Sequence, residues 1–242
     1  MAHGYPDYGL GAAISQLYSV LDLGELAVRL GGHSIVDRRG LTVLQDSFAN
    51  GIGEWATSAT DVGDSVSLLA PVGHSDGYCA YARAAGGASN GCTLTRFGLY
   101  PASGRFGFEV AFKPSTWLEH AGAAFTWALA GTCYSLEWSL DGVNNTLVVA
   151  GVTGGPVTIV ANTTRVINWA YWSVIKLVLD VVTGRPVRVL VNGVTYSLAA
   201  YTLAPQSDLG YDEYRIHLEH ASVVGHIADV YWDDVLVTLN EP

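Results

Sequence analysis

The sequence predicts an all-β protein, a two-sheet antiparallel jelly-roll sandwich preceded by an N-terminal extended arm with a hairpin. From about residue 46 onward, short apolar runs alternate with Gly, Asn, Asp and Pro, and helical periodicity is nearly absent. Half of the 242 residues are apolar, which is enough for the core of one large β domain. We therefore divide the chain into an arm, residues 1–44, and a sandwich domain, residues 45–242.

The clearest strand pair lies in residues 172–193, WSVIKLVLDVVTGRPVRVLVNG. Aliphatic residues alternate along both halves, as expected for strands with one buried face. The Thr-Gly-Arg-Pro segment predicts the turn, with Val181 opposite Val187 and Asp180 opposite Arg188. One face of this hairpin is apolar and needs a second sheet to cover it.

Further strands are predicted between turn residues such as Asp141-Gly142 and Asn192-Gly193. They are Ser65–Leu69, Cys92–Leu99, Gly104–Phe112, Ala123–Leu129, Tyr134–Leu140, Thr146–Ala150, Val157–Val160, Val194–Ala199, Glu213–Glu219 and Ile227–Val237. This number and spacing of short strands is typical of a sandwich or jelly roll.

The arm differs from the rest of the chain. Residues 15–30 mix a short helical or extended run with an interrupting glycine, and residues 33–44, HSIVDRRGLTVL, predict a tight hairpin. Because loose apolar strands aggregate, we expect the arm to pack on its own domain or on a neighbouring subunit. The predicted partners are therefore a second copy of the chain, in a homo-oligomer, and a scaffold protein.

Charge and hydropathy exclude two classes of partner. The formal net charge is −10, with two lysines, and no basic run exceeds Arg38-Arg39, so nucleic-acid binding is not expected. No segment has the apolar length of a membrane span, and the N-terminus lacks the pattern of a signal peptide. A role outside the cell would then require another route of release, such as lysis.

The three cysteines are too few for a disulfide scaffold. Cys79 and Cys92 bracket a loop-like segment and could form a disulfide in an oxidising medium, while three reduced, half-buried thiols are an equal alternative.

Three segments resemble the concanavalin A-like, or laminin G-like, jelly-roll superfamily. They are WSVIKLVLDV at 172–181, RPVRVLVNGVTYSL at 185–198 and HIADVYWDDVLVT at 226–238, and DSFANGIGEW at 46–55 resembles the opening strand and loop of that family. The resemblance covers about the last 195 residues and implies a lectin, a carbohydrate-binding module, a glycoside hydrolase or a structural sandwich.

The sequence lacks the carboxylate pattern of a hydrolase. Hydrolases of the resembled family carry E-x-D-x-x-E on one strand face, because acid and nucleophile must flank one glycosidic bond. The nearest match pairs Glu137 with Asp141, which already sits in an Asp-Gly turn. We therefore expect no enzymatic activity.

The Leu-Glu-His triplet occurs twice, at residues 118–120 and 218–220. Neighbouring residues of a strand point to opposite faces, so each triplet could offer one metal ligand to a shared site. We interpret the triplets as polar positions on two strands that could be neighbours.

Among metal ions, calcium is the one that carboxylate oxygens of such a sandwich would bind, because it prefers oxygen ligands. No other cofactor is expected. The predicted calcium ligands are Asp229, Asp233 and Asp234 on the last strand. The alternative is that the Asp-Asp pair ends or bulges that strand.

Sugar binding would use exposed aromatic rings as flat platforms. The predicted carbohydrate-binding residues are Trp55, Trp117, Trp138, Trp169, Tyr171 and Trp172. Core packing is the alternative role for each of these rings.

These observations predict a non-enzymatic structural or decoration protein on a virus particle, such as a phage capsid or tail, anchored through residues 1–44. The acidic, lysine-poor composition would keep such a displayed protein soluble. The alternative is a lectin-like module that binds glycans, and a glycoside hydrolase is the third hypothesis.

Overall fold

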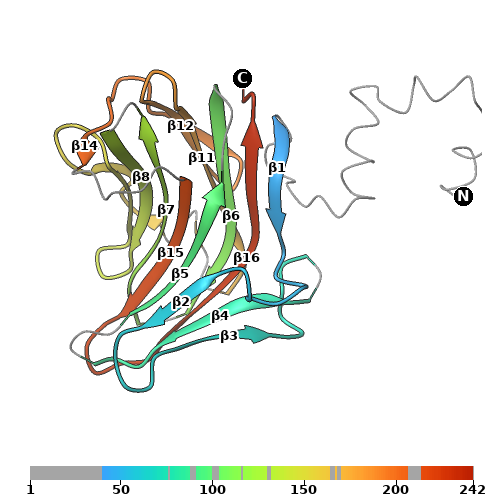
Figure 1. Ribbon diagram of the computed structural model, residues 1–242. Helices are drawn as coiled ribbons and strands as arrows, with labels where there is room; N and C mark the ends of the chain where they lie inside the picture. The colour runs from blue at the N-terminus through green and yellow to red at the C-terminus, as the bar shows by residue number, and fades with distance from the viewer. Residues whose placement is uncertain are drawn as a thin grey trace, which may run out of the picture. The chain divides into compact units, whose positions relative to one another are not determined.

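A computed structural model of the protein confirms the all-β sandwich (Figure 1). The structure describes residues 40–75, 77–87, 91–99, 104–115, 117–129, 132–163, 167, 170–206 and 214–241. Within these ranges every regular element is a β-strand, and no helix is long and apolar enough to cross a membrane. Residues 1–39 of the predicted arm, with most of its hairpin, lie outside the described residues.

The first sheet is antiparallel and contains both the earliest and the last described strands. Its order is β13 (Val194–Ser197), β12 (Arg185–Val191), β11 (Ser173–Asp180), β6 (Arg105–Pro114), β16 (Ala228–Leu239), β4 (Cys79–Ala84) and β3 (Ser65–Leu69), with β1 (Leu41–Asp46) also paired to β16. The long strand β16 therefore binds β6 along one edge, and β4 and then β1 along the other.

The second sheet is also antiparallel and faces the first (Figure 1). Its order is β10 (Val157–Val160), β9 (Thr146–Ala150), β8 (Thr132–Asp141), β7 (Leu118–Leu129), β15 (Tyr214–Ser222), β5 (Cys92–Leu99) and β2 (Ala56–Ala59), with β14 (Pro205–Gln206) also paired to β8.

The core between the sheets is built from alternate residues of the strands. Phe112 of β6 packs on Trp138 of the opposite sheet, with ring centroids 4.8 Å apart, and on Trp232 of its own sheet, 5.8 Å away. Burying a side chain of this size contributes roughly 1.5–3 kcal/mol, so the core residues fix which face of each strand points inward.

The hairpin of β11 and β12 has a different register from the prediction. Val178 lies opposite Arg188, and Asp180 lies opposite Arg185 beyond a bulge. The turn occupies residues 181–184 and includes Gly184 with φ of 61°, so β12 begins earlier than predicted. Before the bulge the register differs from the predicted one by two residues, which leaves each aliphatic side chain on its predicted face.

The sequence-based strands omitted β2, β4 and β14.

Of the two alternatives for Cys79 and Cys92, a disulfide or reduced thiols, the structure has free, buried thiols. Cys79 lies on β4 in the first sheet, whereas Cys92 lies on β5 in the second, and no disulfide joins them. The Cys92 thiol donates to the carbonyl of Arg83 at 3.0 Å. Arg83 is four residues from Cys79 along β4, so the two sulfur atoms lie at different ends of that strand.

Candidate functional site

The outward face of the second sheet carries polar side chains on four neighbouring strands. Register places Thr95, His217, Ala124 and Glu137 in one row across β5, β15, β7 and β8. The next row contains Thr93, Glu219, Gly122 and Ser139, and the row after it contains Ala221, His120 and Asp141. We call these three rows the polar face.

Glu219 is at the centre of the polar face, between two histidines. Its carboxylate lies 3.2 Å from His217 Nε2 and 3.6 Å from His120 Nε2. Thr95 Oγ1 lies 2.9 Å from His217 Nδ1 and orients that ring. His120 and then His217 hold the pKa of Glu219 well below its ordinary value, and Glu219 in turn raises the pKa of His120.

Glu137 has a contrasting environment on the same face. Its Oε1 lies 3.3 Å from the point that a Cβ atom on Gly122 would occupy, so the glycine provides room for the carboxylate over β7. Burial and then the charge of Glu219 raise the pKa of Glu137. Two carboxylates on one face are therefore shifted in opposite directions by their surroundings.

A pocket of about 430 Å³ lies at the end of the polar face. It is lined by Glu119, His120, Ser139, Asp141, Val143, Asn144 and Val148. Asp141 accepts hydrogen bonds from the Asn144 amide N–H at 2.8 Å and from its side chain at 2.7 Å, which lower the pKa of Asp141 despite partial burial. Its turn role is as predicted from the Asp-Gly sequence.

Trp117 presents an exposed ring two residues before Glu119, which lines this pocket. The ring is 58% exposed and stacks on His226, with centroids 4.1 Å apart and planes 9° apart. Its backbone has a φ of 68°, and its carbonyl accepts a hydrogen bond from the Val223 N–H at 3.0 Å. Among the predicted platform residues, Trp117 is thus a flat, accessible aromatic surface.

Two other predicted platform residues belong to the interior, which corrects their assignment. Trp138 is fully buried in the core, and Trp55 is 5% exposed. Trp55 Nε1 donates to Asp46 at 2.9 Å, so its polar edge is also used by the protein. Tyr171 is exposed, Trp172 is partly buried near His74, and Trp169 lies outside the described residues.

The predicted calcium ligands do not converge. Asp229 accepts a hydrogen bond from Tyr81 at 2.7 Å, whereas Asp234 lies 2.6 Å from His74 Nδ1. Asp233 accepts the His74 backbone N–H at 2.5 Å, and burial followed by the charge of Asp234 raises the pKa of Asp233 to about 7. The bulge at Asp234 separates these roles, and no cluster of three or more metal-ligating side chains occurs in the described ranges.

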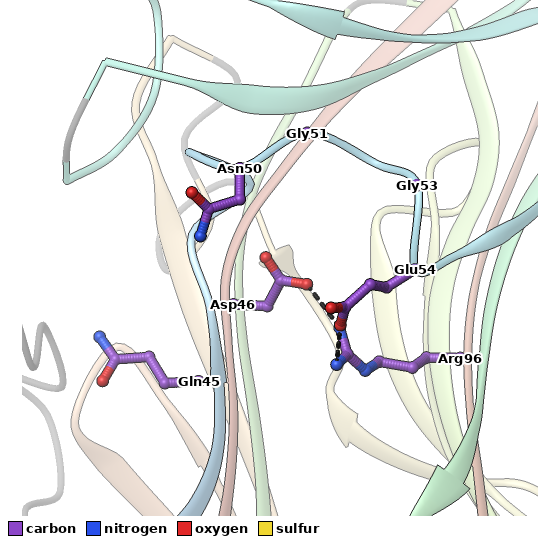
Figure 2. A pocket seen from close by; sticks show the side chains of 7 residues that line it. All are labelled: Gln45, Asp46, Asn50, Gly51, Gly53, Glu54 and Arg96. Carbon is purple, nitrogen blue, oxygen red and sulfur yellow. Dashed lines mark hydrogen bonds and ion pairs between the residues drawn. The ribbon is translucent and has the colours of Figure 1, made fainter.

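A second pocket, of about 210 Å³, has a structural explanation. Figure 2 shows Asp46 and Glu54 directed at Arg96, with which both form ion pairs. Asp46 also accepts the Phe48 backbone N–H at 2.9 Å. These contacts fix the loop between β1 and β2 to β5, so we do not assign this pocket a ligand.

Comparisons with known proteins support the fold. No family model and no curated sequence matches the chain. A solved structure of a sialidase matches with a TM-score of 0.55 and 12% identity over 84% of this chain, which corresponds to 19% of the sialidase. Cellulose induced protein Cip1 matches with a TM-score of 0.53 and 14% identity, covering 81% of this chain and 96% of that protein.

A third structure, titled the conserved carbohydrate esterase vb_24B_21 from Shiga toxin-encoding bacteriophage phi24B, matches with a TM-score of 0.54 and 16% identity. The match covers 84% of this chain and all of that protein. At these identities the likeness concerns architecture. The chain has the concanavalin A-like jelly-roll fold, as its sequence resemblance implied.

Sequence reasoning did not identify the histidine and glutamate cluster of the polar face. The repeated Leu-Glu-His triplet was the available signal, since β7 and β15 are neighbours and each triplet contributes one residue, His120 or Glu219. The other two side chains, Glu137 and His217, required the strand order of the folded sheet.

Proposed function

We propose that the protein binds a carbohydrate across the polar face and against the Trp117 ring. The observation that carries this proposal is the row arrangement of hydroxyl, imidazole and carboxylate groups on one open sheet surface. His217 and Glu219 are each about a third exposed there, so they can still reach a ligand. A sugar presents many hydroxyl groups to such donors and acceptors.

The aromatic contact complements the polar one. The C–H face of a sugar ring packs on a flat aromatic surface, and Trp117 stacked on His226 provides such a surface just before β7, the strand that carries His120. Two structural neighbours are named as carbohydrate-active proteins, a sialidase and a carbohydrate esterase, and a glycan ligand agrees with those names.

We propose binding without turnover. Glu219 interacts with two histidines through its two oxygens, so its carboxylate is already occupied as an acceptor. Hydrolysis is the second candidate, because Glu137 and Glu219 have oppositely shifted pKa values, as acid and base pairs do. Release of new reducing ends from a bound glycan would favour that candidate.

A glycan array of the purified protein, followed by affinity measurements on the best hits, tests the proposal. Trp117→Ala should weaken binding at least about tenfold, the loss expected when an aromatic platform is removed, with little change in thermal stability. Tyr171→Ala is the matched control, because Tyr171 is an exposed ring two residues before β11, a strand of the other sheet. An array without hits, or equal losses for both variants, would refute the proposed site.

Display on a virus particle is the further proposal for the biological setting. It rests on the acidic, lysine-poor composition and on the apolar arm, which would dock to a neighbouring copy or to a capsid or tail protein. A glycan-binding domain exposed on such a particle would serve adhesion, so this setting and the proposed ligand are compatible.

A further inference from the structure

Glu137 differs from the other carboxylates of the polar face, because it has no hydrogen-bond or ion-pair partner among the described residues. Glu219 is bound by His120 and His217, and Asp141 is bound by Asn144. No hydrogen bond or ion pair of the described part of the chain includes Glu137. Its Oε1 instead lies over Gly122, where a side chain would otherwise stand.

The charged groups around Glu137 can be assigned strand by strand. From β15 it faces Glu219 and His217, and from β7 it faces His120. Its neighbours on β9 are Ala150, opposite it, and Val148, one row away, and neither titrates. Both histidines are already engaged with Glu219, so no group in these rows is dedicated to neutralising Glu137.

The rest of the polar face offers little positive charge to an acidic ligand. Among the described residues of this face, the permanently positive side chain is that of Arg215. It lies beyond the His217 row, with its guanidinium over the Phe97 ring. The pocket at the opposite end is lined by Glu119 and Asp141. A uronic acid or a sialic acid would therefore bring a carboxylate into a region of negative charge.

We propose that the ligand of the polar face is a glycan containing a free amino sugar, whose ammonium group binds Glu137. The inference rests on the carbohydrate-binding function proposed above and specifies its substrate class. An ammonium group donates up to three hydrogen bonds. It also supplies a positive charge that pairs with the half-buried carboxylate of Glu137. Because Gly122 has no side chain, residue 122 of β7 does not cover Glu137 Oε1.

Proton linkage gives this proposal a distinctive signature. Burial and Glu219 raise the pKa of Glu137, so the free protein retains a proton there at a higher pH than an ordinary glutamate does. A bound ammonium group favours the carboxylate, and binding should then release that proton. A neutral sugar in the same place would release none.

The test uses three tetrasaccharides of matched length: β-1,4-linked glucosamine, its N-acetylated form and a galacturonic acid oligomer. Binding is measured by calorimetry at physiological ionic strength. The pH is chosen from a titration of the free glucosamine tetramer, so that its amines are protonated. We expect the glucosamine tetramer to bind about tenfold tighter than the N-acetylated one, as one charge-assisted hydrogen bond implies, and the galacturonate to bind most weakly.

Variants separate this contact from general attraction to an acidic protein. Glu137→Gln should abolish the preference for the amine and the release of the proton, measured in two buffers of different ionisation enthalpy. Glu54→Gln removes the same charge from an exposed residue that pairs with Arg96, and it should retain both. Melting temperatures of both variants verify that they fold.

Equal or tighter binding of the N-acetylated or galacturonate tetramer would overturn the amino-sugar inference and leave the proposed carbohydrate function standing. A preference that survives in Glu137→Gln would overturn the assignment of Glu137. Failure of all three tetramers to bind would overturn the inference, and the glycan array with Trp117→Ala would then decide the proposed function separately.

Discussion

Removing the carboxylate of Glu241 should strongly destabilise the sandwich. Glu241 follows β16 and folds onto the outer side of the first sheet, where its Oε1 lies 2.7 Å from Lys176 Nζ. Neither side chain is exposed to solvent. Arg188 lies 3.1 Å from the other carboxylate oxygen, and Thr238 Oγ1 donates to Glu241 as well.

The magnitude follows from the burial of Lys176. Breaking a buried pair by removing one partner costs about 3–5 kcal/mol, because the remaining charge is left uncompensated in a region without water. Glu109, which is buried and lies opposite Lys176 on β6, still balances part of that charge. We therefore expect about 3 kcal/mol for Glu241→Gln, or about 6–12 °C in melting temperature for a domain of this size.

Urea unfolding followed by tryptophan fluorescence measures this loss, with thermal scans as a second method. The double variant Lys176→Met, Glu241→Gln should be more stable than Glu241→Gln alone, since it also removes the buried lysine charge that Glu241 had balanced. Lys113→Met is the control for removing a partly exposed lysine, and it should change the unfolding free energy by less than about 1 kcal/mol. A loss below about 1 kcal/mol for Glu241→Gln, or a double variant less stable than that single variant, would refute this account of the buried pair.

Three other perturbations have defined outcomes. Burial lowers the pKa of His220 to about 4, so the unfolded chain binds more protons between about pH 6.5 and pH 4, and the unfolding free energy should fall by about 3 kcal/mol across that window. His220→Gln should flatten the fall in urea titrations, while the same change at exposed His226 should not. Gly107→Ala should cost about 1–3 kcal/mol in thermal unfolding, because the new methyl group would lie 2.6 Å from Lys176 Cε. Deleting residues 1–39, which stops short of β1 and its pairing with β16, should convert an oligomer into a folded monomer in light scattering, and an unchanged mass would contradict the arm's role in assembly.

The sequence determined the class of fold because strand periodicity and turn chemistry are local properties. The alternation in β11 assigned Ile175, Leu177 and Leu179 to the core. Asn192-Gly193, with φ values of 47° and 86°, forms the tight turn that the dipeptide predicts. The concanavalin A-like resemblance came from the same segments. Edge strands such as β2 were missed, since four exposed residues give no hydrophobic pattern.

The tertiary structure decided the site, because strand order in a jelly roll joins segments distant in sequence. Glu137 and Glu219 share one face because β7 lies between β8 and β15, and no spacing along the chain encodes that order. Burial also depends on the opposite sheet, which covers Trp138 within β8, whereas Trp117, just before β7, stays exposed. The sequence pattern thus specified a β sandwich with aromatic and acidic side chains, whereas packing of the two sheets decided which of these side chains face solvent and which lie next to each other.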